Sequence, residues 1–125
     1  MKKYILLPLV IFFAGLLLSS CKKEGQETKY ITLNEIVNSG STYTLEPAIY
    51  GDADDVASIT TQAAHFSVSQ IDLDPATAKS MYHFSIITKV QDKETVVITL
   101  KDNHGGRGRH CDHDPTVITI NLTVE

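Results

Sequence analysis

Apolar and polar residues alternate along two segments near the C-terminus, residues 95–100 and 118–124. Both segments have a period of two and are rich in β-branched residues, a pattern typical of half-buried β-strands. The positions that we expect to face a core are Val96, Ile98, Leu100, Ile118, Ile120, Leu122 and Val124. Thr119, Asn121 and Thr123 fall on the opposite face of the last strand.

Shorter apolar patterns predict three further strands. Their apolar residues are Tyr43, Leu45 and Ile49 in the first, Phe66 and Val68 in the second, and Tyr82, Phe84 and Ile86 in the third. Pro47 indicates that the first lies at a sheet edge or bends there. Turn-forming clusters separate the strands at residues 38–40, 51–55, 72–75 and 91–93. Short strands at such spacing, without a long helical period, predict an all-β sandwich or barrel.

The C-terminal half also resembles a known family. Residues 94–106 and 116–124 resemble the last hairpin of bacterial immunoglobulin-like and cadherin-like domains, and residues 82–85 resemble the aromatic strand before it. The resemblance implies a single immunoglobulin-like antiparallel β-sandwich, which we expect to span residues 30–125. It departs from the family at residues 107–115, an insertion where a tight turn is usual. Such folds host many functions, and the resemblance implies adhesion or binding more often than catalysis.

The N-terminus has the composition of a secretory signal peptide. Lys2 and Lys3 precede an apolar run over residues 4–18, and small residues follow. A transmembrane anchor is the alternative, but a spanning helix needs about 20 apolar residues. This run is shorter and contains Pro8. We therefore expect residues 1–20 to be a signal peptide.

Leu18-Ser19-Ser20-Cys21 resembles the lipobox of bacterial lipoproteins. The resemblance implies that Cys21 carries the lipid and becomes the first residue of the mature chain. Several fatty chains would anchor the protein firmly to a membrane. Lys22 stands where an aspartate would resemble an inner-membrane retention signal, which favours the outer membrane. The sequence leaves open whether the domain faces the periplasm or the cell exterior.

Removal of the signal peptide makes the chain more acidic. The whole chain has a net charge of −4, and the mature chain would carry 9 basic against 15 acidic residues, or −6. Residues 21–29 combine the lipidated cysteine with a polar stretch that is typical of a flexible tether. Because nucleic acid binding needs a basic face, the charge argues against a nucleic acid partner.

The insertion and the residues just before it, 104–114, hold a dense set of potential metal ligands. They are His104, His110, Cys111 and His113, joined by Asp112 and Asp114. Imidazole and thiolate groups bind zinc and copper, although the spacing matches no established zinc pattern. With Cys21 lipidated, Cys111 would be the only thiol left, so it is buried, metal-bound or paired with another molecule. The alternative for the whole segment is a solvated hairpin tip.

Other candidate chemistry is weaker. Carboxylates at residues 52–55 and 72–74 could serve calcium, but aspartate is also a common turn residue. We expect His65 and His83 to lie in strands as solvent-facing residues and possible cross-strand neighbours, and this interpretation is favoured over a second metal patch. The sequence has no nucleophile elbow, phosphate loop or dinucleotide motif, so we expect no enzyme. Two hypotheses follow: a lipid-anchored envelope module that binds a protein or glycan, and a metal-binding lipoprotein that uses the 104–114 loop.

Overall fold

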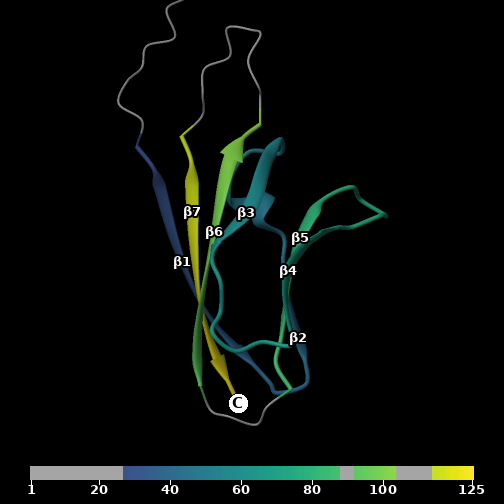
Figure 1. Cartoon of the computed structure of the whole chain (residues 1–125). Coiled ribbons are helices and arrows are strands. Elements are labelled where there is room, and N and C mark those ends of the chain that lie inside the picture. The colour runs from purple at the N-terminus through teal and green to yellow at the C-terminus, as the bar shows by residue number, and fades with distance from the viewer. Residues whose placement is uncertain (1–26, 88–91, 104–113) are drawn as a thin grey trace, which may run out of the picture.

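The structure is a computed structural model that describes residues 27–87, 92–103 and 114–125. Within these ranges the chain forms seven strands and one short 3₁₀ helix, shown in Figure 1. The elements are β1 (Lys29–Val37), β2 (Thr42–Leu45), η1 (Pro47–Tyr50), β3 (Asp55–Thr61), β4 (Val68–Leu73), β5 (Ser80–Ser85), β6 (Lys93–Asp102) and β7 (Thr116–Val124).

The strands form two sheets that share one core, with the order β1-β7-β6-β3 in the first and β2-β5-β4 in the second. This confirms the predicted all-β sandwich. The immunoglobulin fold divides its strands between two sheets in the same way. Its second, fourth and fifth strands form one sheet, here β2, β4 and β5, and its third, sixth and seventh belong to the other, here β3, β6 and β7. One pairing is not antiparallel: β1 runs parallel to β7, with Lys29 opposite Thr116 and Val37 opposite Val124.

The core is built from the alternate residues that the period of two assigns to it. β6 and β7 contribute Val96, Ile98, Leu100, Ile118, Ile120, Leu122 and Val124, all buried as predicted. Tyr82 and Phe84 of β5 are also fully buried and belong to the same cluster. The Tyr82 hydroxyl lies 2.8 Å from the hydroxyl of Ser69 on β4, so its polar end has a partner inside the core.

Two sequence predictions in the first half of the chain are wrong. Ile49 is not in a strand. It lies in η1, because Pro47 fixes the φ angle suited to the first helical turn, and its side chain is exposed. Phe66 is not in a strand either, since β4 begins at Val68.

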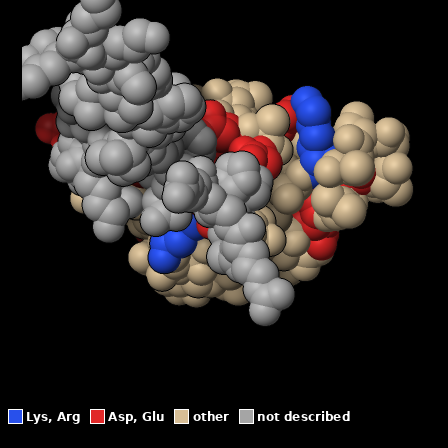
Figure 2. Space-filling model, turned by 90° about the horizontal axis from the view of Figure 1, so that it is seen from above, with Lys and Arg blue, Asp and Glu red and all other residues tan. Residues whose placement is uncertain are grey.

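The sandwich has two ends, which the pairings define. At the Lys29 end, β1 and β7 begin, and the backbone N–H of Lys29 donates to the carbonyl of Pro115. A surface pocket there is lined by acidic residues and one lysine, and Figure 2 views this end with its Asp and Glu side chains. These pocket residues are Glu27, Lys29, Asp52, Asp55 and Asp114.

At the opposite end, the Glu125 end, β7 finishes and β6 begins. The carbonyl of Glu125 accepts a hydrogen bond from the N–H of Ser39, and the carbonyl of Ile86 accepts one from the N–H of Gly40. The loop between β3 and β4, residues 62–67, lies at this end as well, because its backbone contacts the start of β6. The Glu125 end thus gathers chain segments that are distant in sequence.

Candidate functional site

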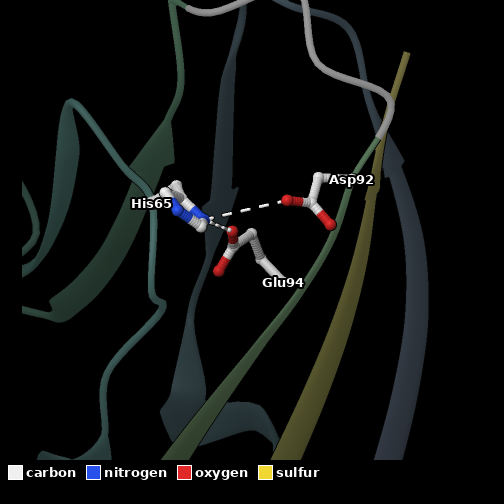
Figure 3. A group of neighbouring side chains, drawn as sticks. All are labelled: His65, Asp92 and Glu94. Carbon is white, nitrogen blue, oxygen red and sulfur yellow. Dashed lines mark hydrogen bonds and ion pairs between the residues drawn. The ribbon is translucent and has the colours of Figure 1, made fainter.

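Three side chains with metal-binding or acid–base chemistry meet at the Glu125 end: His65 from the 62–67 loop, Glu94 from the start of β6, and Asp92 from just before that strand (Figure 3). The Nδ1 atom of His65 lies 2.8 Å from Oε1 of Glu94 and 3.8 Å from Oδ2 of Asp92. One ligand atom from each residue lies within 4.8 Å of the other two. We call these three residues the His65 cluster.

The fold places Glu94 inside the protein. Glu94 is in phase with Val96 and Ile98 on the inward face of β6, and its side chain is only 2% exposed. A buried carboxylate without partners is costly, so its bonds matter. Oε2 accepts a hydrogen bond from the N–H of Ala64 at 2.7 Å, and Oε1 faces the imidazole of His65.

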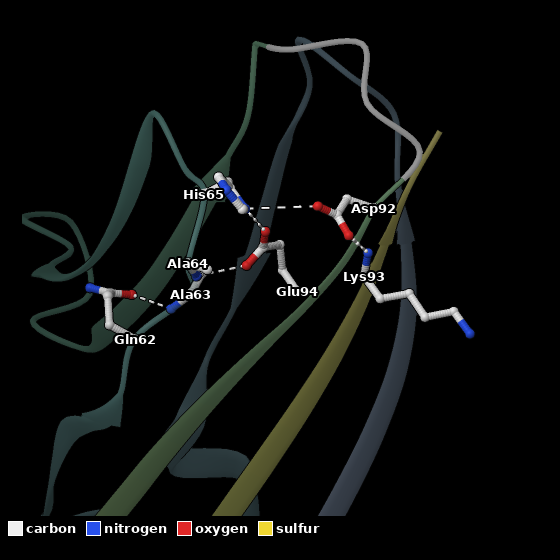
Figure 4. A network of polar contacts seen from close by, with 7 residues as sticks. All are labelled: Gln62, Ala63, Ala64, His65, Asp92, Lys93 and Glu94. Carbon is white, nitrogen blue, oxygen red and sulfur yellow. Dashed lines mark hydrogen bonds and ion pairs between the residues drawn. The ribbon is translucent and has the colours of Figure 1, made fainter.

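Asp92 makes the same two kinds of contact nearer the surface, with one oxygen bound to a backbone N–H and the other facing His65, as Figure 4 shows. Its Oδ1 accepts the N–H of Lys93 at 2.8 Å, while its Oδ2 faces His65. The side chains of His65 and Asp92 are 67% and 44% exposed. Solvent and ions therefore reach a cluster whose innermost carboxylate is buried.

The cluster has two chemical possibilities. A protonated His65 would form an ion pair with Glu94, and Asp92 would add a second negative charge nearby. A neutral His65 would instead offer the Nδ1 lone pair, together with two carboxylate oxygens, to a cation. Both options leave the buried Glu94 charge compensated.

Apolar residues border the cluster. Phe66 and Ile87 are 44% and 75% exposed, although both are large hydrophobic side chains. Together with His65 they line a surface pocket at the Glu125 end. This surface is not predicted from the sequence, because the apolar pattern indicates a strand at Phe66 and does not connect the 62–67 loop with β6.

The ligand set predicted from the sequence, His104, His110, Cys111 and His113, lies outside the described residues, as does the predicted lipidation residue Cys21. The two remaining histidines are not cross-strand neighbours, so that expectation is wrong. His83 on β5 is paired with Thr44 and Gln70, and its Nδ1 lies 3.3 Å from the Thr44 hydroxyl. His65 lies in a loop instead.

Several of the aspartates considered for calcium take part in turns, whereas Asp72 lies in β4 and accepts a hydrogen bond from the Gln70 side chain. Asp55 accepts a hydrogen bond from the N–H of Asp52 at 2.8 Å. Asp74 accepts the Thr77 hydroxyl at 2.7 Å and the N–H of Ala76 at 3.0 Å, and these bonds lower the pKa of Asp74. They close the connection between β4 and β5.

One sequence signal could have found the His65 cluster. Glu94 occupies a core-facing phase of a strongly alternating strand, where an acidic residue is out of place unless it has a buried partner. That signal identifies Glu94 but not its partners, since His65 lies 29 positions earlier in the chain.

Among the described residues, no helix has the length and apolar character required to cross a bilayer. No protein-family model matches the chain, and a search of characterised proteins found no relative. Several solved structures are similar at a low level, and two of them serve as examples. A 2,6-sialyltransferase from a Photobacterium species, solved with CMP and lactose, is 13% identical with a TM-score of 0.48; the match covers 80% of this chain and 18% of that one. A cysteine protease inhibitor from Entamoeba histolytica is 10% identical with a TM-score of 0.41, covering 81% of this chain and all of the inhibitor (100%).

Proposed function

We propose that the chain is a lipid-anchored, non-enzymatic module of the bacterial cell envelope that binds a protein partner with its Glu125 end. The lipobox-like residues 18–21 support the anchor, and the residue after Cys21 favours the outer membrane. The following polar stretch leads into β1 at Lys29. An anchor at Cys21 would therefore hold the molecule by its Lys29 end.

The fold determines which end such an anchor leaves free. β1 has nine residues and runs from the Lys29 end to the Glu125 end. At about 3.3 Å per residue, it separates the two ends by about 30 Å. The Glu125 end would consequently point away from the membrane, where a partner has room to approach.

The observation that carries the proposal is the exposed apolar pair at that end. Phe66 and Ile87 line one pocket beside His65, and large exposed apolar groups in one place are typical of interaction sites. Aromatic side chains are enriched at protein interfaces, which favours a protein over a glycan as the partner.

Photo-crosslinking in the bacterium that makes the protein tests this proposal. Phe66 is replaced by a photoreactive benzoyl-phenylalanine, and Tyr30 is replaced in a matched control. Tyr30 is a suitable control because it is also an exposed aromatic residue, 77% exposed, at the Lys29 end. We expect a discrete protein adduct from position 66 and none from position 30. Equal labelling at both positions, or a glycan adduct at position 66, would contradict the proposal.

A further inference from the structure

We propose that His65, Asp92 and Glu94 form a zinc-binding site with a fourth position open to solvent. This inference does not depend on a lipid anchor or on a protein partner. It differs from the 104–114 ligand set that the sequence suggests, since it uses another loop and the start of β6. The zinc ligands would be Nδ1 of His65, Oδ2 of Asp92 and Oε1 of Glu94.

The spacing of the three atoms fits a tetrahedral ion. Zinc bonds to nitrogen and carboxylate oxygen are about 2.0–2.2 Å long, so two ligands of one ion lie about 3.3 Å apart. Nδ1 of His65 is 2.8 Å from Oε1 of Glu94, which is shorter than this ligand spacing, and 3.8 Å from Oδ2 of Asp92, which is longer. The ligand atoms of Asp92 and Glu94 lie within 4.8 Å of each other, so side-chain rotations that bring these two closer would place all three atoms around one ion.

The backbone already orients both carboxylates. In Glu94 the N–H of Ala64 binds Oε2, and in Asp92 the N–H of Lys93 binds Oδ1. Each carboxylate consequently has one oxygen fixed and the other directed toward His65 (Figure 4). Such outer contacts orient the ligands of metal sites and raise their affinity.

The donor set favours zinc over the common hard cations. Calcium takes six to eight oxygen ligands, and magnesium prefers oxygen ligands and retains several waters. One imidazole nitrogen with two carboxylate oxygens suits zinc, which binds both ligand types in sites that keep a water in the fourth position. A divalent ion would also neutralise the two carboxylates, one of which is buried.

The first test is zinc stoichiometry in the full chain, expressed in a bacterial host and purified in mild detergent. Because His104, His110, Cys111 and His113 could bind zinc themselves, all four are replaced by alanine to give the parent for the comparison. Native mass spectrometry is then run with added zinc, and separately with calcium or magnesium. We expect one zinc ion per chain and no retained calcium or magnesium.

Three variants of this parent locate the ion. His65→Ala should abolish zinc binding, and Asp92→Asn should weaken it at least tenfold. His83→Ala is the matched control, because His83 bonds to Thr44 and lies on β5, and it should bind zinc like the parent. Because His65→Ala also removes one partner of the buried Glu94 carboxylate, its circular dichroism spectrum and unfolding midpoint are measured beside zinc binding to establish that the variant is folded.

A second readout works in the unaltered sequence and does not rely on variants. In a ¹⁵N spectrum of the imidazole groups, zinc should shift the Nδ1 resonance of His65 strongly and its Nε2 resonance little. The proposal is overturned if the parent binds no zinc, if His65→Ala binds as much as the parent, or if zinc leaves the His65 nitrogens unchanged. In each of those outcomes His65 is not a zinc ligand, and the crosslinking experiment at position 66 stands unaffected.

Discussion

Glu94 combines a charged group with a core position, and the structure shows how its charge is compensated. Its neighbours in phase, Val96 and Ile98, are fully buried, and its own side chain is almost so. The N–H of Ala64 and the imidazole of His65 take the place of water around the carboxylate. Glu94 therefore joins the 62–67 loop to β6, whatever else the cluster binds.

Replacement of Glu94 by alanine should lower the free energy of unfolding by about 1–3 kcal/mol. The reason is that the N–H of Ala64 loses its acceptor in a partly buried hydrogen bond. Urea unfolding measures the change. Glu46→Ala is the control, since Glu46 forms a more exposed ion pair with Lys79, and such pairs contribute about 0–1 kcal/mol. If Glu94→Ala and Glu46→Ala lower the free energy of unfolding equally, Glu94 does not hold the 62–67 loop as described.

Tyr43 makes stability depend on alkaline pH. Burial, followed by the nearby Glu35, Tyr50 and Tyr82, raises the pKa of Tyr43 to about 12 from the ordinary value of 10.0. Burial also raises the pKa of Tyr82. Above pH 10 an unfolded chain loses the tyrosine proton first, so the folded state loses relative stability as pH rises.

We therefore expect the free energy of unfolding to be insensitive to Tyr43 ionisation below pH 10 and to fall between pH 10 and about 12. Urea unfolding across this range measures the fall. Tyr43→Phe should make the decline shallower, because phenylalanine has no proton to lose. An unchanged pH profile in the variant would show that Tyr43 titrates alike in the folded and unfolded states.

At the scale of elements, the connection between β1 and β2 depends on one glycine. Gly40 has a φ of +83°, in the left-handed region that costs other residues energy, and its N–H donates to the carbonyl of Ile86. A Cβ atom there would meet nothing within 4 Å, so the strain would lie in the backbone alone.

Gly40→Ala should accordingly destabilise the fold by about 1 kcal/mol, after allowance for the reduced entropy of the unfolded chain. Thermal and urea unfolding provide the measurement. Gly40→Asn should cost less, because asparagine tolerates the left-handed conformation. If Gly40→Ala leaves the free energy of unfolding unchanged, the turn has adopted another conformation and does not require a positive φ angle at residue 40.

The accuracy of the sequence prediction differs between elements for a physical reason. β6 and β7 alternate cleanly and lie inside their sheet, so their buried residues could be predicted individually. The sequence pattern predicts no strand at β1 or β3, because their alternation of apolar and polar residues is weaker than that of β6 and β7. In β1 one of the inward-facing positions is occupied by a charged, partly exposed residue, Glu35. In β3 an apolar residue, Val56, faces outward and is exposed, and the pairing of β3 with β6 shifts its register between Ile59 and Thr61.

The candidate site was harder to predict than the fold. The period of two shows which face of a strand is buried, but it does not show which loop reaches that strand. His65 approaches Glu94 only because β3 and β4 belong to different sheets and the loop between them crosses the Glu125 end. The contact thus depends on the topology of the whole fold, which the residue pattern of a single strand does not reveal.

At the scale of the whole molecule, the proposed orientation depends on Cys21. Cys21→Ser should move the protein from the membrane fraction to the soluble envelope or secreted fraction, since lipid chains alone would hold it. Fractionation followed by intact mass measurement tests this, and Cys111→Ser is the matched control, which should stay with the membrane. A Cys21→Ser protein that remains membrane-bound and has an unchanged mass would contradict the lipid anchor.

The interaction end is tested most directly by the crosslinking comparison between positions 66 and 30 in living cells. We expect one protein adduct from position 66, absent from position 30, and weakened when Ile87→Ser removes the neighbouring apolar side chain. The same adduct from both positions, or an adduct at position 66 that Ile87→Ser leaves intact, would contradict the claim that the exposed apolar surface beside His65 binds a partner.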